Sequence, residues 1–368
     1  MLLTPGPTPV PEFVRKAMSD ITIHHRTEEF EAIFKNTREL LIEIYDMPEV
    51  VMLASSGTGA MEACVTNLTH KKALTINSGK FGERFGKICA AFGIDYTEIK
   101  NEWNTPVSVE AVINAVKADS SIDAVFIQIC ESAGGLRHPV ELIAAKVKKI
   151  NKDIMIIADG ITAIGVEKID TTNLDAVITG SQKALMLPPG LAIIGLSNEA
   201  VAKIELKPRG YYFNLATEIK NQRKNTTAWT AATTLIIGLG AILEKLKADG
   251  FDNLYKQTAL RANATREALK AIGFDIYPKT PANAMTTVYT EQSSAIRKIL
   301  ENKYNVNIAG GQDHLAGKIF RINHMGLVEN YEASWAVNAV ELALDDLGIR
   351  PFDGTANKVF ALNMFKGN

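Results

Sequence analysis

The chain has few cysteines, no excess of charge of either sign and no long apolar run. Its 368 residues include three cysteines, Cys64, Cys89 and Cys130. They lie far apart without CxxC spacing, so we expect buried thiols and neither a disulfide framework nor a metal site. The 40 basic and 41 acidic residues nearly cancel, which argues against binding to nucleic acid or an anionic membrane. No apolar run reaches the roughly 18 residues that span a bilayer, and Met1–Pro7 lacks the features of a signal peptide, so we expect a soluble cytoplasmic protein.

Hydrophobic residues make up 46% of the chain and charged residues 22%, which is typical of a folded globular protein. Short apolar runs alternate with amphipathic segments in the first half. The expected strands are 50–54, 73–76, 124–129, 154–158, 176–179 and 191–196, and the expected helices between them are 59–68, 81–92, 109–116 and 140–150. Strands that are apolar throughout imply burial on both faces. The pattern therefore predicts an α/β fold with a doubly wound, mostly parallel sheet.

The pattern changes after about residue 208, where two long helices are expected over 232–246 and 253–272. Shorter strands and helices follow, as in a smaller α+β unit. We expect a large domain over residues 15–255, a small domain formed by 1–14 and 256–350, and a loose tail over 351–368.

Small residues with hydroxyl groups follow the first expected strand and open a helix, in the segment Ser55–Ala60. Glycines allow close approach to a ligand, and the start of a helix offers free N–H groups, so the segment suits a phosphate. A helix cap is the alternative. Glu62 stands where a dinucleotide fingerprint needs Gly or Ala, and the lysine of a P-loop is missing. Phosphate binding is therefore favoured over dinucleotide binding.

Three charged residues lie where apolar strands should bury them. Asp159 ends an expected central strand, where open α/β sheets bind ligands; it would pair with a cation or a protonated ring, or else cap the next element. Lys183 lies between two apolar strands, so it points into the cleft unless it is solvated like most lysines. Arg321 lies in a short apolar strand and would bind a carboxylate, either of a substrate or of an internal salt bridge.

Together these segments match the requirements of pyridoxal phosphate (PLP) catalysis. The lysine would form a Schiff base with the cofactor aldehyde and later move a proton. The aspartate would keep the pyridine nitrogen protonated, which makes the ring an electron sink. The arginine would bind the carboxylate of an amino acid.

The sequence resembles the class V aminotransferases, in particular the alanine–glyoxylate and serine–glyoxylate group, over nearly its whole length. The most specific motif is Gly180–Ala184, followed by Pro188–Gly190. The resemblance implies the aspartate-aminotransferase-like PLP fold: a large domain with a mostly parallel, seven-stranded sheet flanked by helices, and a smaller α+β C-terminal domain.

The resemblance also implies roles for individual residues. Lys183 corresponds to the Schiff-base lysine and Asp159 to the partner of the pyridine nitrogen. The other implied cofactor contacts are Ser56, Gly57, Thr58 and Gln182 at the phosphate, Phe81 stacked on the ring, and Ser132 near the ring hydroxyl. Arg321 corresponds to the arginine that binds the substrate carboxylate, and Gly6 lies beside the substrate. For Phe81, simple helix packing is the alternative.

In the family the resemblance identifies, two subunits complete each active site. It therefore implies a homodimer in which Thr227 and Thr230 reach the cofactor phosphate of the partner subunit. Ala231 replaces a proline of the family pattern, which leaves the register of this contact open.

The resemblance favours a transaminase that moves an amino group from alanine or serine to glyoxylate or pyruvate by a ping-pong mechanism. A phosphoserine or 2-aminoethylphosphonate transaminase is the alternative, with Arg26 or Arg209 as a second anion site. A desulfurase would need a late cysteine, and no cysteine follows Cys130. A nucleotide-dependent oxidoreductase would leave Lys183 and Arg321 unexplained, and a binding protein without activity would not need these charged residues.

Overall fold

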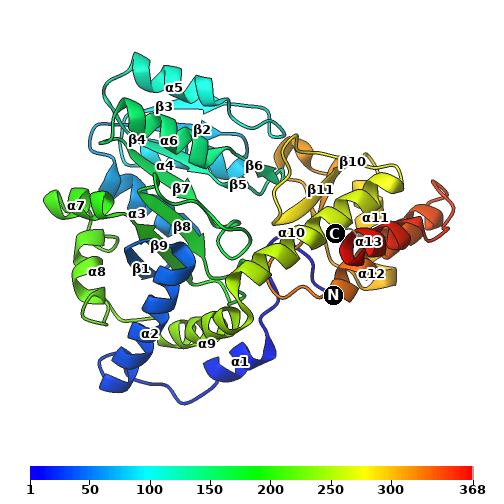
Figure 1. Ribbon diagram of the computed structural model, residues 1–368, viewed down its shortest axis with the longest axis horizontal. Coiled ribbons are helices and arrows are strands. Elements are labelled where there is room, and N and C mark those ends of the chain that lie inside the picture. The colour runs from blue at the N-terminus through cyan, green and yellow to red at the C-terminus, as the bar shows by residue number, and fades with distance from the viewer. Residues whose placement is uncertain (367–368) are drawn as a thin grey trace.

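A seven-stranded sheet forms the centre of the larger of two units in the computed structural model of the protein, which describes residues 1–366 (Figure 1). The strand order is β1-β9-β8-β7-β4-β2-β3. The strands are β1 (Glu49–Ala54), β2 (Lys72–Asn77), β3 (Tyr96–Lys100), β4 (Ile122–Gln128), β7 (Met155–Asp159), β8 (Ala176–Gly180) and β9 (Leu191–Leu196). Only the pairings of β9 are antiparallel, so the predicted mostly parallel sheet is confirmed.

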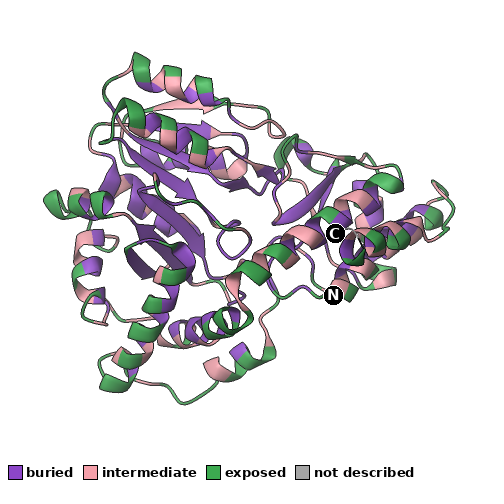
Figure 2. Cartoon of the chain, viewed as in Figure 1, coloured by how far each residue is buried: buried purple, intermediate pink, exposed green. Residues whose placement is uncertain are grey.

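Successive residues of each strand enter two different cores, one on each face of the sheet. In β7, Ile156 packs in one core and Ile157 in the other. The first core is closed by α1 (Glu12–Met18), α2 (Glu28–Tyr45), α5 (Val109–Ala118), α6 (Val140–Ile150) and α9 (Thr233–Asp249), and the second by α3 (Gly57–Leu68), α4 (Lys80–Ala91), α7 (Asn198–Leu206) and α8 (Leu215–Gln222). Figure 2 shows the strands buried between these helices. Burial on both faces explains why the strands are apolar throughout.

The smaller unit is an antiparallel sheet of order β10-β11-β13-β12 packed against helices. Its elements are β10 (Asp275–Ile276), β11 (Met285–Tyr289), β12 (Ala309–Gly310), β13 (Ile319–Asn323), α10 (Phe251–Ala271), α11 (Ser293–Tyr304), α12 (Asn330–Asp346), α13 (Thr355–Phe365) and the short 3₁₀ helix η1 (Asp313–Leu315). Leu3 belongs to the core of this unit, so the first residues of the chain join its last third. A two-stranded hairpin of β5 (Cys130–Glu131) and β6 (Leu136–Arg137) lies between the units.

Two of the differences from the expectations lie in the predicted tail and at the edge of the large sheet. The loose tail predicted after residue 350 contains α13, which buries Phe360 and Ala356 against the small-unit core; apolar burial, not local sequence signals, holds this helix. Strand β3, YTEIK, was not predicted, because an edge strand lacks the continuous apolar run of its neighbours. The division near residue 255 is predicted within a long helix, and that residue lies inside α10, which runs from one unit to the other (Figure 1).

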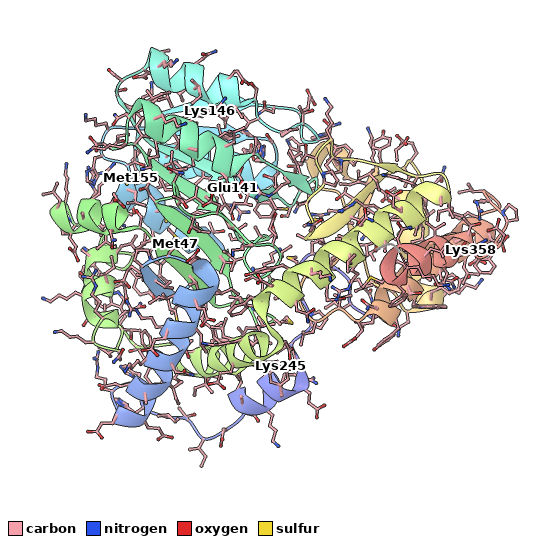
Figure 3. The ribbon with its side chains drawn as sticks, viewed as in Figure 1. Met47, Glu141, Lys146, Met155, Lys245 and Lys358 are labelled. Atoms are coloured by element: carbon pink, nitrogen blue, oxygen red, sulfur yellow. The ribbon has the colours of Figure 1, made fainter. Side chains whose placement is uncertain are left out.

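Charged side chains lie on the outer faces of the helices. Lys146 on α6, Lys245 on α9 and Lys358 on α13 are exposed, whereas Met47 and Met155 lie at the buried sheet (Figure 3). Within residues 1–366, we find no helix that is both long enough and apolar enough to cross a bilayer.

Candidate active site

The predicted site residues follow parallel strands that end at one edge of the large sheet. Ser56 follows β1, Phe81 follows β2, Asp159 ends β7 and Lys183 follows β8. In a parallel sheet these carboxyl ends are the usual place for a ligand. The strand order thus brings together residues that are distant in sequence.

A hydrogen-bonded turn holds Lys183. The Ser181 hydroxyl donates to the Pro188 carbonyl over 2.7 Å and accepts the Leu191 amide over 3.2 Å. The Lys183 side chain is partly buried, and its Nζ donates to the Pro5 carbonyl. Burial and, to a lesser degree, the positive charge of Arg321 lower the pKa of Lys183 to about 8. The amine is therefore turned inward, and a larger share of it is neutral and nucleophilic than for a solvated lysine.

The N-terminal segment runs across this turn. The Thr8 amide donates to the Gln182 carbonyl over 3.0 Å, and the Thr8 hydroxyl to the Lys183 carbonyl over 2.7 Å. Gly6 has a φ of +123°, and a methyl group there would lie 2.5 Å from Lys183 Nζ. The structure therefore places Gly6 directly beside the amine, where a larger residue does not fit.

Asp159 is a buried carboxylate without an ion-pair partner among residues 1–366. Only 3% of its surface is exposed, and its Oδ1 accepts the Ile161 amide over 3.0 Å. Burial raises the pKa of Asp159 to about 6, although the positive charges of Arg84 and Lys183 oppose the rise. A cation or a protonated ring nitrogen at this position would compensate the buried charge.

The segment predicted to bind a phosphate lies at the start of α3. Ser56 is the N-cap residue, but its side chain caps no amide. The Gly59 amide donates to the Ser56 carbonyl over 2.9 Å, so the amides of Gly57 and Thr58 are the ones left for an anion in the described chain. The Thr58 hydroxyl accepts from Arg84 over 2.9 Å. Gln182 Oε1 is buried without a partner, and rotation of the carboxamide offers either its oxygen or its NH₂ group. Gly57 begins the helix, and these groups together suit a phosphate.

Two charged residues of the site were not predicted. Arg84, one turn after Phe81 on α4, lies over the Phe81 ring at 4.8 Å from its centroid. Glu131, next to Ser132, is fully buried and accepts the amides of Phe81 and Gly82 over 3.1 and 2.8 Å. Their only sequence signals were their positions in the segments that contain Phe81 and Ser132.

Arg321 lies in the middle of β13 and is held by carbonyl groups alone. Its Nε and Nη2 donate to Gly310 over 3.1 and 2.6 Å, and its Nη1 donates to the Ser132 carbonyl over 2.6 Å. No carboxylate among residues 1–366 forms an ion pair with it, so the alternative of an internal salt bridge is wrong. Burial lowers the pKa of Arg321 to about 10, although the negative charge of Glu131 opposes the fall. The guanidinium is therefore free to bind a carboxylate from outside the chain.

No hydrogen bond joins Thr227 or Thr230 to Lys183 among residues 1–366. Thr227 is buried and its hydroxyl donates to the Trp229 carbonyl, whereas Thr230 is exposed. Both line a small pocket that also reaches Ala54 at the end of β1. Ser132, by contrast, contacts the Arg321 side chain through its carbonyl.

These residues fit pyridoxal phosphate on three structural grounds. For the phosphate, the amides of Gly57 and Thr58 at the start of α3 and the Gln182 carboxamide, whose Oε1 has no partner among residues 1–366, would supply contacts. The carboxylate of Asp159, which no cation of residues 1–366 neutralises, would face the pyridine nitrogen. The inward amine of Lys183 would react with the aldehyde.

Comparison with known proteins gives matches over almost the entire chain. The family profile described as "Aminotransferase class-V" matches residues 2–328. An "uncharacterized aminotransferase" of Helicobacter pylori is 47% identical, covering 98% of both chains. A serine–glyoxylate aminotransferase of Hyphomicrobium methylovorum is 30% identical, over 99% of this chain and 95% of the relative. The crystal structure of a subgroup IV aspartate aminotransferase from Thermus thermophilus superimposes with a TM-score of 0.87 at 30% identity, over 94% of this chain and 99% of the other.

Proposed function

The chain belongs to the class V aminotransferase family, and on this premise we propose that it is a PLP-dependent transaminase for small substrates. The amino donor would be alanine or serine, and the acceptor glyoxylate or pyruvate. The observation that carries the proposal is the convergence of Lys183, Asp159 and Arg321, three buried or partly buried charged groups that no ion pair of the described chain neutralises.

Each of these residues has a defined role in the proposed reaction. The bound cofactor supplies an electron sink for the carbon that carries the amino group. Lys183 attaches the cofactor covalently and, once released, moves the proton at that carbon. Asp159 holds the pyridine nitrogen in its protonated form. Arg321 binds the carboxylate of the amino acid and then that of the oxo acid, because both substrates carry this group; their use of one site in turn is the basis of a ping-pong mechanism.

The activities of two relatives support small carboxylate substrates. These relatives are serine–glyoxylate and aspartate–glyoxylate aminotransferases. The competing phosphoserine or aminoethylphosphonate activity needs a second anion site. Arg209, one candidate for it, donates to the Thr69 carbonyl, at the end of α3 opposite the segment predicted to bind a phosphate. Within one subunit this contact disfavours Arg209 as a substrate ligand.

In the proposed enzyme, two subunits form a homodimer that completes each site. We also propose that the protein is cytoplasmic. No hydrogen bond joins Thr227 or Thr230 to the Lys183 turn within residues 1–366 of one subunit, and the resemblance to the family assigns both residues to the phosphate of the partner subunit. Analytical ultracentrifugation with and without PLP tests this part of the proposal.

A donor–acceptor screen tests the reaction. The purified protein should bind PLP and turn yellow, and alanine or serine should bleach the colour. Borohydride reduction of the yellow protein, before any amino donor is added, should label the peptide that contains Lys183. Lys183→Ala should lose both label and turnover, whereas the exposed control Lys358→Ala should keep them. Normal turnover by Lys183→Ala would refute the role assigned to the lysine. Activity found only with phosphoserine or 2-aminoethylphosphonate as donor would favour the alternative function.

A further inference from the structure

The Glu131 carboxylate connects two parts of the candidate site. Its Oε2 accepts the amides of Phe81 and Gly82, which open α4, and its Oε1 accepts the Ala133 amide over 3.0 Å. Gly79 packs against the same carboxylate, since a methyl group there would lie 2.4 Å from Cδ of Glu131. One side chain thus ties the start of α4 to the turn that contains Ser132.

The turn that contains Ser132 also holds Arg321, the arginine proposed to bind the substrate. Arg321 Nη1 donates to the Ser132 carbonyl over 2.6 Å, and Ser132 lies between Glu131 and Ala133, the two ends of the carboxylate's local hydrogen bond. Displacement of the carboxylate would therefore move the Phe81 ring on one side and the anchor of Arg321 on the other.

Glu131 is buried without an ion-pair partner in the described chain, which is unusual for a carboxylate that only holds backbone amides in place. Glu131 is 0% exposed, and no lysine, arginine or histidine of residues 1–366 forms an ion pair with it. Its interaction partners among charged groups are Asp159 and Arg321, both of which belong to the site. An unpaired buried charge is costly unless amides or a nearby cation stabilise it.

We infer that Glu131 is a positioning residue that sets the placement of the Phe81 ring relative to the Arg321 guanidinium, and so the alignment of cofactor ring and substrate carboxylate. The expected effect of Glu131 on substrate KM rests on the proposed function. The contacts themselves are independent of bound cofactor.

Glu131→Gln is the first test. The amide keeps the shape but turns one acceptor oxygen into a donor, which faces a backbone N–H. We expect the KM for alanine and for pyruvate to rise about tenfold while kcat changes less, because ground-state and transition-state binding fall together. The visible circular dichroism band of bound PLP should also change, and the amides of Phe81 and Gly82 should exchange hydrogen faster in the cofactor-free protein.

Glu341→Gln is the matched control. Glu341 is also 0% exposed and also accepts two amides at a helix start, those of Thr355 and Ala356 over 3.2 and 3.0 Å. Unlike Glu131, it also forms an ion pair with Arg350, so its substitution should cost at least as much stability. It lies in the small unit, remote from the site. The control should lose stability but keep the KM values, the dichroism and the exchange of the Phe81 amide.

Gly79→Ala supplies a second route that keeps the carboxylate but displaces it. We expect the same rise in KM, change in dichroism and faster exchange, and this variant decides the question if Glu131→Gln does not fold. The inference is overturned if either folded variant behaves like Glu341→Gln. Failure of the wild-type protein to bind PLP would refute the proposed function instead, and the hydrogen exchange of the cofactor-free variants would still test the role of Glu131.

Discussion

Replacing Asp159 by Asn should stabilise the cofactor-free protein at neutral pH while weakening its binding of PLP. Burial raises the pKa of Asp159 from 3.8 to about 6. That difference corresponds to about 3 kcal/mol of unfolding free energy, since one pKa unit is about 1.4 kcal/mol. Asparagine removes the charge but keeps the oxygen that accepts the Ile161 amide. The same charge is needed when a protonated pyridine nitrogen faces it, so the loss should weaken cofactor binding.

The gain in stability has a defined pH dependence. The pKa of Asp159 is higher in the folded chain than in the unfolded chain, so the folded chain binds more protons between these two values. Above about pH 6 the carboxylate is ionised in both states, and folding bears the full cost of burying it. Below about pH 3.8 it is neutral in both states, and the cost disappears. The advantage of Asp159→Asn should therefore grow from less than about 1 kcal/mol near pH 4 to about 3 kcal/mol near pH 7.5.

Urea unfolding of the cofactor-free wild type and variant at the two pH values measures this difference, and a PLP titration measures the loss of affinity. Asp119→Asn is a control of opposite sign, because a hydrogen bond from Lys72 lowers the pKa of Asp119 to about 2. It should reduce stability near pH 7.5. If Asp159→Asn is no more stable than the wild type there, or if its gain does not depend on pH, the buried carboxylate is already compensated and the reasoning fails.

Three further substitutions test other parts of the structure. Arg321→Ala should lower kcat/KM for both amino and oxo acids about 30-fold or more, because truncating one partner of a buried charge pair costs about 2–5 kcal/mol; loss of PLP binding instead would make the residue structural. Gly6→Ala should prevent covalent attachment of the cofactor, read by borohydride labelling, because its methyl group would lie 2.5 Å from the lysine amine. Gly93→Ala, with φ of +63° and open space around it, should retain the label, and equal labelling of both variants would contradict the placement of Gly6. Phe360→Ala should cost about 3–5 kcal/mol of unfolding free energy, whereas Phe365→Ala, at a side chain 64% exposed, should change it by about 0.5 kcal/mol or less; similar effects in denaturant unfolding would mean that α13 is not packed.

The sequence by itself determined the elements and site positions whose signals are local. Continuous apolar runs predicted the central strands, because burial on both faces of a sheet requires them. The small residues after β1 predicted an anion site, since a helix start offers free N–H groups wherever it lies. Lys183 and Asp159 were predicted from their positions at strand ends, and the motif around Lys183 also identified the family, which the comparisons confirm.

Only the tertiary structure decided which distant groups meet. It shows that Arg321 is held by carbonyls rather than by a carboxylate, and that Gly6 lies against the amine of Lys183. It also brings Glu131 to the amides at the start of α4 and packs α13 into the small-unit core. These contacts join segments far apart in the chain, and short-range periodicity carries no information about them. They are set by how the strands and helices pack. Packing also determines which charged groups are buried, and a buried charge needs a partner either within the protein or from a ligand.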